Sequence, residues 1–112
     1  MVNMVRIAFP TDKGGLDDYI YDRFGRAPTF TIIEVEDGEI KNVKIIENLG
    51  HRAVSGAGIK AVQKLIEEKI DVVAGPNPGP NAYMALQQAN IKVISMLGLK
   101  VKDAIEHVIK QL

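Results

Sequence analysis

The C-terminal half of the sequence alternates between short apolar runs and segments with helical periodicity, and this alternation constrains the fold more than any other feature. Residues 71–74 form a short apolar run that ends at Gly75, as expected for a strand that is covered on both faces. A helical segment follows at about residues 81–89 and leads into a β-type run at residues 91–95. Because strands joined by a helix pair in parallel through a right-handed crossover, this half predicts a parallel sheet with helices packed on it.

Two further helices flank these strands. Ser55 is a candidate N-cap for a helix through about residue 68, although Gly56 and Gly58 weaken its first turn. Residues 101–112 carry apolar side chains at intervals of three and four, which predicts a last helix with one stripe on the sheet. The residues expected to face inward are Ile59, Val62, Leu65, Ile66 and the stem of Lys69 in the first helix, and Val101, Ala104, Ile105, Val108, Ile109 and Leu112 in the last.

The chain begins with an alternating apolar pattern. Val5, Ile7 and Phe9 predict a strand, and Pro10, which lacks a backbone donor, is expected to end it. A loop is expected over residues 19–27, which show no clean period.

A hairpin should follow this loop. Residues 29–36 are rich in β-branched side chains, and Asp37-Gly38 favours a type I′ turn that returns the chain as an antiparallel strand at residues 40–46. The resulting order is β-β-β-α-β-α-β-α. It predicts an α/β protein with a mixed five-stranded sheet, helices packed on that sheet and a ribonuclease-H-like layout.

Composition limits the classes of function. With 112 residues, the chain is expected to form a single domain over residues 1–112. Basic and acidic residues are equal in number, at 14 each, which argues against nucleic acid as a partner. The absence of Cys excludes thiolate metal sites, disulfides and cysteine nucleophiles. No segment has the pattern of a secretory signal or a membrane span, so we expect a cytoplasmic protein that does not contact a membrane.

A turn rich in Gly and Pro, residues 75–81, is the first candidate binding segment. It connects a strand to the start of a helix, where free N–H groups and the helix dipole favour anions. Gly75, Asn77, Gly79 and Asn81 could line such a site. Alternatively, these residues simply shape a tight connection with Pro80 in the first helical turn, and the three prolines remove donors that a phosphate would need.

The loop at residues 22–26 is the second candidate. Arg23 and Arg26 flank Phe24-Gly25, and two guanidinium groups could clamp a carboxylate or phosphate. In the competing interpretation, Asp22 neutralises one arginine, Phe24 fills the sheet edge and both arginines stay solvated.

The glycine-rich segment 51–58 is the third candidate, through His51, Gly56 and Gly58. A neutral imidazole suits iron, zinc or copper, so His51 is the candidate metal ligand. A single histidine without a second ligand nearby can equally be an exposed loop residue. His107 lies beside the apolar stripe of the last helix and is a weaker candidate.

These three segments, in order, resemble one protein family. Residues 22–30 (Asp-Arg-Phe-Gly-Arg-Ala-Pro-Thr-Phe) are similar to the motif of the iron-molybdenum-cofactor biosynthesis proteins, which usually reads His-Phe-Gly followed by small residues and an aromatic one. Residues 75–82 (Gly-Pro-Asn-Pro-Gly-Pro-Asn-Ala) resemble that family's Gly-Pro-x-Ala turn, and residues 51–58 occupy the place of its His/Gly-rich segment. The resemblance covers essentially the whole chain.

The resemblance implies a nitrogenase accessory factor-like protein that handles an iron-sulfur or iron-molybdenum type cluster. In relatives, the His before Phe-Gly is the natural candidate to ligate the cofactor, and here Arg23 occupies that position. An arginine stays protonated and is not an ordinary metal ligand, which leaves His51 as the histidine expected to border the pocket.

The leading hypothesis is a non-enzymatic carrier of a small anion or metal cluster, with a shallow site where the three segments meet at one edge of the sheet. The expected binding residues are Asp22, Arg23, Phe24, Gly25, Arg26, His51, Gly56, Gly58, Gly75, Asn77, Gly79 and Asn81. A second hypothesis is a regulatory or protein-interaction module that binds no metal. A third is a two-metal nuclease with Asp12 and either Glu34 or Glu36, although Gly75-Pro76-Asn77 stands where a further acid would be needed.

Overall fold

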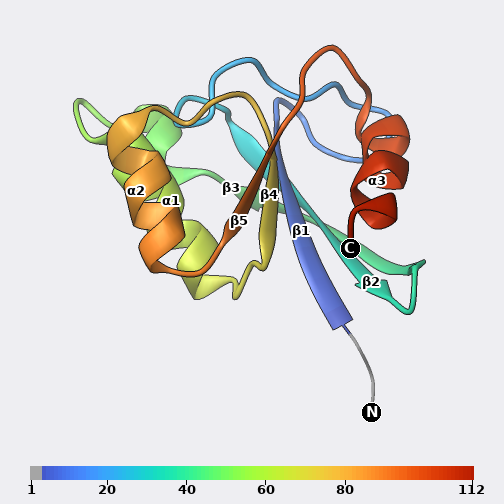
Figure 1. Ribbon diagram of the computed structural model, residues 1–112. Helices are drawn as coiled ribbons and strands as arrows, with labels where there is room; N and C mark the ends of the chain where they lie inside the picture. The colour runs from blue at the N-terminus through green and yellow to red at the C-terminus, as the bar shows by residue number, and fades with distance from the viewer. Residues whose placement is uncertain (1–3) are drawn as a thin grey trace.

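The computed structural model describes residues 4–112, in which five strands form one mixed sheet in the order β3-β2-β1-β4-β5 (Figure 1). Its elements are β1 (Met4–Thr11), β2 (Thr29–Glu36), β3 (Glu39–Glu47), a 3-10 helix η1 (Leu49–Arg52), α1 (Ala57–Glu67), β4 (Val72–Gly75), α2 (Pro80–Gln88), β5 (Lys92–Ser95) and α3 (Val101–Lys110). β1, β4 and β5 are parallel, whereas β2 and β3 are antiparallel to their neighbours. The α/β class, the mixed five-stranded sheet and the element order are confirmed, and the ribonuclease-H-like label stays a prediction.

The predicted β2–β3 hairpin is confirmed. Asp37 and Gly38 have φ angles of 52° and 83°, as a type I′ turn requires. The two strands pair from Thr29↔Glu47 to Glu36↔Glu39, with a register shift between Glu34 and Val35.

The expectation that Pro10 ends the first strand is wrong, because β1 continues to Thr11. Pro10 lies opposite Phe30 of β2, and its carbonyl accepts a hydrogen bond from the N–H of Tyr21 at 2.8 Å. That carbonyl points away from β2, so the position of the missing N–H also points away from β2 and no bond to that strand is lost.

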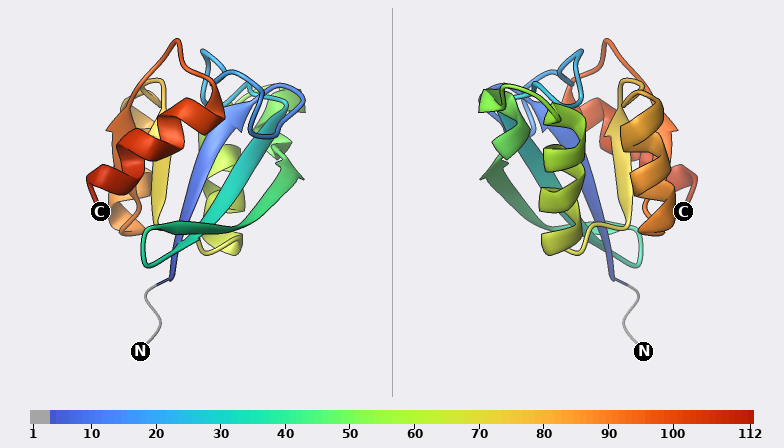
Figure 2. Two further views of the ribbon diagram at one scale, coloured as in Figure 1. Left: turned by 90° about the vertical axis from the view of Figure 1, so that its right-hand side faces the viewer. Right: turned by 90° about the vertical axis from the view of Figure 1, so that its left-hand side faces the viewer.

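Helices cover the two faces of the sheet unequally: α1 and α2 lie on one face and α3 on the other (Figures 1 and 2). Alternate residues of β1 serve the two cores, since Ala8 packs with the α1–α2 layer and Ile7 and Phe9 pack with α3. The predicted stripe of the last helix is largely confirmed, with Val101, Ala104, Ile105 and Val108 buried. Leu112 was expected in this stripe but lies beyond the end of α3 and is exposed.

Helix α1 differs from the prediction in its start and in its rotation. It begins at Ala57 with Gly56 as N-cap in the left-handed region, so Ser55 does not cap it. Val62 and Leu65 are buried as predicted, and Ala61 takes an inward position. Ile59 and Ile66, which were expected inward, are 38% and 49% exposed, and Lys69 is exposed beyond the end of α1. Small residues on this side allow α1 to approach α2, because a Cβ on Gly58 would lie 3.2 Å from the Cβ of Ala82.

The C-terminal βαβ unit is confirmed, with boundaries shifted by one residue. β4 ends at Gly75, α2 begins with Pro80 in its first turn, and β5 is parallel to β4 from Val72↔Lys92 to Gly75↔Ser95. Over residues 4–112, no helix is both long enough and apolar enough to cross a membrane.

Candidate functional site

The candidate site lies at the edge of the sheet where the parallel strands have their carboxyl ends. β1, β4 and β5 all end at this edge, which is uppermost in Figure 1, and α1 and α2 both begin there. Ligands of α/β proteins bind preferentially at such edges, because loops and helix N-termini gather there.

A pocket of about 350 Å³, here called the loop pocket, lies between these segments. Residues of all three segments line it: Asp22, Arg23, Phe24, Gly25, Arg26, Ala57, Gly58, Asn77, Pro78 and Gly79. The structure thus brings the three predicted segments together. The segment at residues 51–58 contributes through the start of α1 and not through His51.

The backbone itself makes this convergence possible. A Cβ on Gly25 would lie 2.9 Å from the backbone N of Gly58, and a Cβ on Gly50 would lie 2.3 Å from the carbonyl oxygen of Ala57 and 2.7 Å from that of Gly25. Real Cβ atoms do not approach backbone this closely, so only glycine fits at either position. The floor of the site is therefore a contact between bare backbone segments.

Asn48 fastens these segments and was not among the predicted site residues. Its side chain is fully buried, and its Nδ2 lies 2.9 Å from the carbonyl of Ala27, with longer contacts to the carbonyls of Phe24 and Gly25. Its Oδ1 accepts a hydrogen bond from the N–H of Gly50 at 3.0 Å. One sequence signal was available, because Asn is a favoured N-cap and Asn48 caps η1.

Two helix starts supply hydrogen-bond donors at the site. Neither α1 nor α2 has a side-chain cap, and their first intrahelical bonds come from the N–H groups of Lys60 and Tyr83. The first-turn N–H groups of Ala57, Gly58 and Ile59 have no acceptor within the described chain. Such groups, together with the helix dipole, favour a negatively charged ligand.

The two arginines of the first segment have different surroundings. Arg26 donates from Nη1 to the carbonyl of Ala53 at 2.6 Å, which ties the loop to the segment before α1. Arg23 is exposed and forms no ion pair or hydrogen bond with any other residue in 4–112, including Asp22. Phe24 is buried against Phe30, with ring centroids 5.7 Å apart, and forms a wall of the pocket.

His51 lies beside the loop pocket but does not line it. Its ring is exposed, and Nδ1 is 3.2 Å from the carbonyl oxygen of Arg26. A proton on Nδ1 would satisfy this contact and leave Nε2 as the nitrogen available to a metal. No group of three His, Cys, Asp or Glu side chains that could hold a metal ion occurs within residues 4–112.

The remaining predicted residues fall into three places. Gly56 and Asn81 line an adjoining pocket of about 220 Å³ between the starts of α1 and α2. Gly75 is buried against the ring of Pro10, where a Cβ would lie 2.8 Å from Cγ, so it shapes the sheet and not the pocket. Asn77 accepts a hydrogen bond from the N–H of Gly79 at 3.0 Å and so stiffens the turn.

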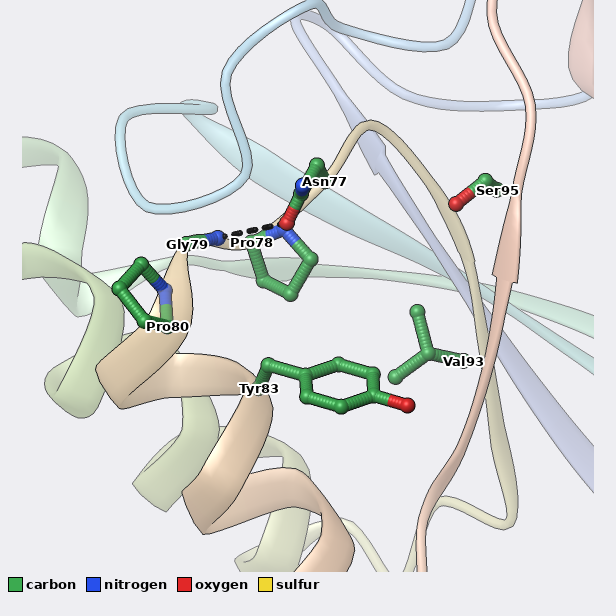
Figure 3. Close-up of a pocket in the computed structure, with 7 residues that line it drawn as sticks. All are labelled: Asn77, Pro78, Gly79, Pro80, Tyr83, Val93 and Ser95. Carbon is green, nitrogen blue, oxygen red and sulfur yellow. Dashed lines mark hydrogen bonds between the residues drawn. The ribbon is translucent and has the colours of Figure 1, made fainter.

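A further pocket, here called the edge pocket, lies on the other side of this turn (Figure 3). Its volume is about 340 Å³, and its lining residues are Asn77, Pro78, Gly79, Pro80, Tyr83, Val93 and Ser95. Figure 3 shows the ring of Tyr83 extending from α2 toward Val93 of β5. The sequence prediction did not include Tyr83 or β5 in any site.

The acids considered for a nuclease lie apart. Asp12 follows the end of β1, whereas Glu34 lies opposite Arg6 toward the other end of the sheet. Glu34 forms an ion pair with Arg6, and the hydrogen bond from Asn42 lowers its pKa, with Arg6 acting in the same direction. An acid that is paired in this way serves the fold of the sheet, not a shared metal site with Asp12.

Comparison with known proteins identifies the family. The family model described as dinitrogenase iron-molybdenum cofactor matches residues 3–111. The uncharacterized protein MJ0580 of Methanocaldococcus jannaschii is 35% identical over 92 residues, which cover 82% of this chain and 75% of that protein.

Solved structures agree with this match. The apo form of the orange protein from Desulfovibrio gigas has a TM-score of 0.87 at 32% identity, with 97% of this chain and 90% of that chain covered. A NifB-like protein from Thermotoga, solved by NMR, has a TM-score of 0.77 at 34% identity, with 95% and 88% covered. The chain belongs to the dinitrogenase iron-molybdenum cofactor family, as its three ordered motifs predicted.

Proposed function

We propose that this protein is a non-enzymatic carrier that holds a metal-sulfur cluster of the iron-molybdenum cofactor class in the loop pocket. The observation that carries the proposal is the meeting of Arg23 and the uncapped start of α1 in one pocket, above a floor of bare backbone. Family membership and the likeness to the orange protein, which was solved in an apo form, support a ligand of this kind.

The cargo would be held mainly by hydrogen bonds and charge. The first-turn N–H groups of α1 would donate to the sulfur atoms or acid groups of a cluster, and the guanidinium of Arg23 would pair with its negative charge. This mode of binding suits a carrier, because the cargo can leave without the breaking of a bond from the protein to a metal. His51 could add a ligand only through Nε2, from outside the lining of the pocket.

A carrier function also agrees with the chemistry of the lining. Its titratable side chains are one acid, Asp22, and the two arginines, Arg23 and Arg26. Arginines do not exchange protons near neutral pH, so this set lacks the paired acid and base that hydrolysis or acyl transfer would use.

Anaerobic titration with isolated iron-molybdenum cofactor tests the proposal, with bound iron and molybdenum counted after gel filtration. We expect about one cofactor per chain and a roughly tenfold weaker affinity for Arg23→Ala, because a charge-assisted hydrogen bond is lost. Arg52→Ala is the matched control, since Arg52 is also exposed and does not line the pocket. His51→Ala should retain the cofactor. The proposal fails if no cofactor is retained by the wild-type protein or if both arginine variants behave alike.

A further inference from the structure

The β4–α2–β5 part of the chain is almost free of charged residues. The chain has 14 basic and 14 acidic residues, yet the whole stretch 72–99, from β4 through α2 and β5 to the following loop, contains a single charged residue, Lys92. Several apolar side chains of this stretch are nevertheless exposed, namely Tyr83, Met84 and Leu97. Interface cores are depleted of charged residues and enriched in aromatic residues and Met, which is the composition found here.

Strand β5 presents a free backbone edge in this part of the chain. It is the last strand of the sheet, and its bonds to β4 use alternate residues, as shown by Lys92 N to the carbonyl of Asp71 at 3.0 Å and Met96 N to the carbonyl of Gly75 at 2.9 Å. The N–H and C=O groups of Val93 and Ser95 therefore point away from β4. No other strand of the described chain pairs with them.

The edge pocket opens beside these free groups. Val93 and Ser95 contribute to its lining, while Tyr83 and Pro78 supply apolar walls from α2 and from the turn before it (Figure 3). A backbone edge with an adjacent apolar pocket is the arrangement by which sheets bind extended peptides: main-chain bonds give affinity and the pocket selects a side chain.

We propose that the β5 edge binds an extended segment of a partner protein, which adds a strand to the sheet, places an apolar side chain in the edge pocket and sets an acidic residue against Lys92. An extended backbone can pair with all the free N–H and C=O groups of Val93 and Ser95 at once, which makes it the occupant that fits this edge. Charge decides the kind of partner. The β5 strand of a second copy would bring the same lone lysine and no acid, so pairing of two β5 edges would leave Lys92 without an acid opposite it.

Such a partner would sit next to the cargo. Asn77, Pro78 and Gly79 line both the loop pocket and the edge pocket, so the turn is a shared wall. A strand bound to β5 would contact one side of this turn, and a cluster in the loop pocket would contact the other side. This arrangement suits a partner that delivers or receives the cluster. This coupling rests on the proposed function, whereas the peptide-binding edge itself does not.

The probe is the peptide acetyl-Thr-Glu-Val-Thr-Val-Glu-Thr-amide. Its acids lie on the face opposite its valines, as Lys92 lies on the face opposite Val93, and its symmetry suits either strand direction. It is titrated into ¹⁵N-labelled protein without any anion or cluster. We expect saturable shifts of the amide signals of Tyr83, Val93 and Ser95, and slower amide exchange at Val93 and Ser95. The same peptide N-methylated at every residue should not bind, because none of its amides can donate to the β5 edge.

Matched variants locate the contact. Ser95→Pro removes an N–H that β4 does not use and should weaken the peptide about tenfold. Ser95→Ala keeps that N–H and should bind as the wild-type protein does. Lys92→Gln should weaken binding of the peptide with its two Glu residues and leave unchanged the binding of the same peptide with Gln in their place.

The edge proposal would be overturned if the peptide caused no saturable shift, or if Ser95→Pro and Ser95→Ala bound it equally. It would also be overturned if, without peptide, the amides of Val93 and Ser95 became more protected from exchange as the protein concentration rises, because the edge would then bind a second copy. Because no cluster is present in this titration, its outcome is independent of the cofactor experiment.

Discussion

Removal of the buried Asn48 side chain should destabilise the protein more than any other polar truncation near the site. Asn48→Ala leaves the N–H of Gly50 and the carbonyl of Ala27 without their 3.0 Å and 2.9 Å partners, and both residues are buried. An unsatisfied buried polar group costs about 1–3 kcal/mol, and a water that enters the space would recover part of this. We therefore expect a loss of about 2–4 kcal/mol in the free energy of unfolding.

Urea denaturation at neutral pH measures this loss, as a lower midpoint with an unchanged m-value. Hydrogen exchange provides a local readout, because the amide of Gly50 loses its acceptor and should exchange faster. Asn81→Ala is the control: Asn81 is exposed and forms no side-chain hydrogen bond with other residues of 4–112, so its loss should stay within about 0.5 kcal/mol. If Asn48→Ala lowered the free energy of unfolding by less than about 1 kcal/mol, this side chain would not be what holds the loops together.

Two further predictions concern the sheet and α1. The hydrogen bond from Lys44 lowers the pKa of Glu68, and the hydrogen bond from Asn42 lowers that of Glu34, so ionisation of both groups stabilises the fold above the ordinary pKa of 4.5 and this contribution is lost as the pH falls below it. In the double variant Glu34→Gln, Glu68→Gln, the urea midpoint should therefore change less between pH 6 and pH 3 than in the wild-type protein. An equally steep dependence of the midpoint on pH would contradict this prediction. Leu65→Ala should cost about 2–4 kcal/mol in unfolding free energy, because the side chain is fully buried. Ile66→Ala, the matched control at 49% exposure, should cost less than about 1 kcal/mol, and equal losses would show that the rotation of α1 is misassigned.

Local patterns were enough to predict most of the fold. Asp37-Gly38 specifies the hairpin by the positive φ angles that its two residues tolerate, and the spacing of Val101, Ala104, Ile105 and Val108 specifies the buried stripe of α3. Both signals depend on neighbours within a few residues, so they do not require knowledge of the rest of the chain.

The predictions were wrong where a contact between residues far apart in the sequence determines the local structure. Pro10 stays in β1 because its carbonyl faces Tyr21 and not β2, which no local rule contains. The rotation of α1 follows from the close approach of Gly58 to Ala82 in α2, and this approach exposes Ile66 although its spacing fits an inward face.

In the site, too, some features could be predicted from local sequence and others depend on distant contacts. The meeting of three turns at one edge could be predicted, because loops that follow parallel strands gather at their carboxyl ends. The different surroundings of Arg23 and Arg26 could not, because Arg26 is bound by a carbonyl 27 residues away. The role of Asn48 was missed for a similar reason, because its side chain donates to carbonyls that lie more than 20 residues away in the sequence.

The size of the available interactions argues for a cargo larger than a single small anion. An exposed helix N-terminus contributes about 0.3–1 kcal/mol to the binding of a negative charge, and two such termini contribute roughly 1–2 kcal/mol. A millimolar Kd already requires about 4 kcal/mol. The loop pocket is open and its donors are spread over two turns, so a phosphate-sized ligand would engage only some of them. A cluster with several acceptor atoms could meet the N–H groups of α1 and the guanidinium of Arg23 at once, and could also contact the apolar surfaces of Phe24 and Pro78. Inorganic phosphate should therefore bind at least a hundredfold more weakly than isolated iron-molybdenum cofactor, and comparable affinities would favour a general anion site over a cluster carrier.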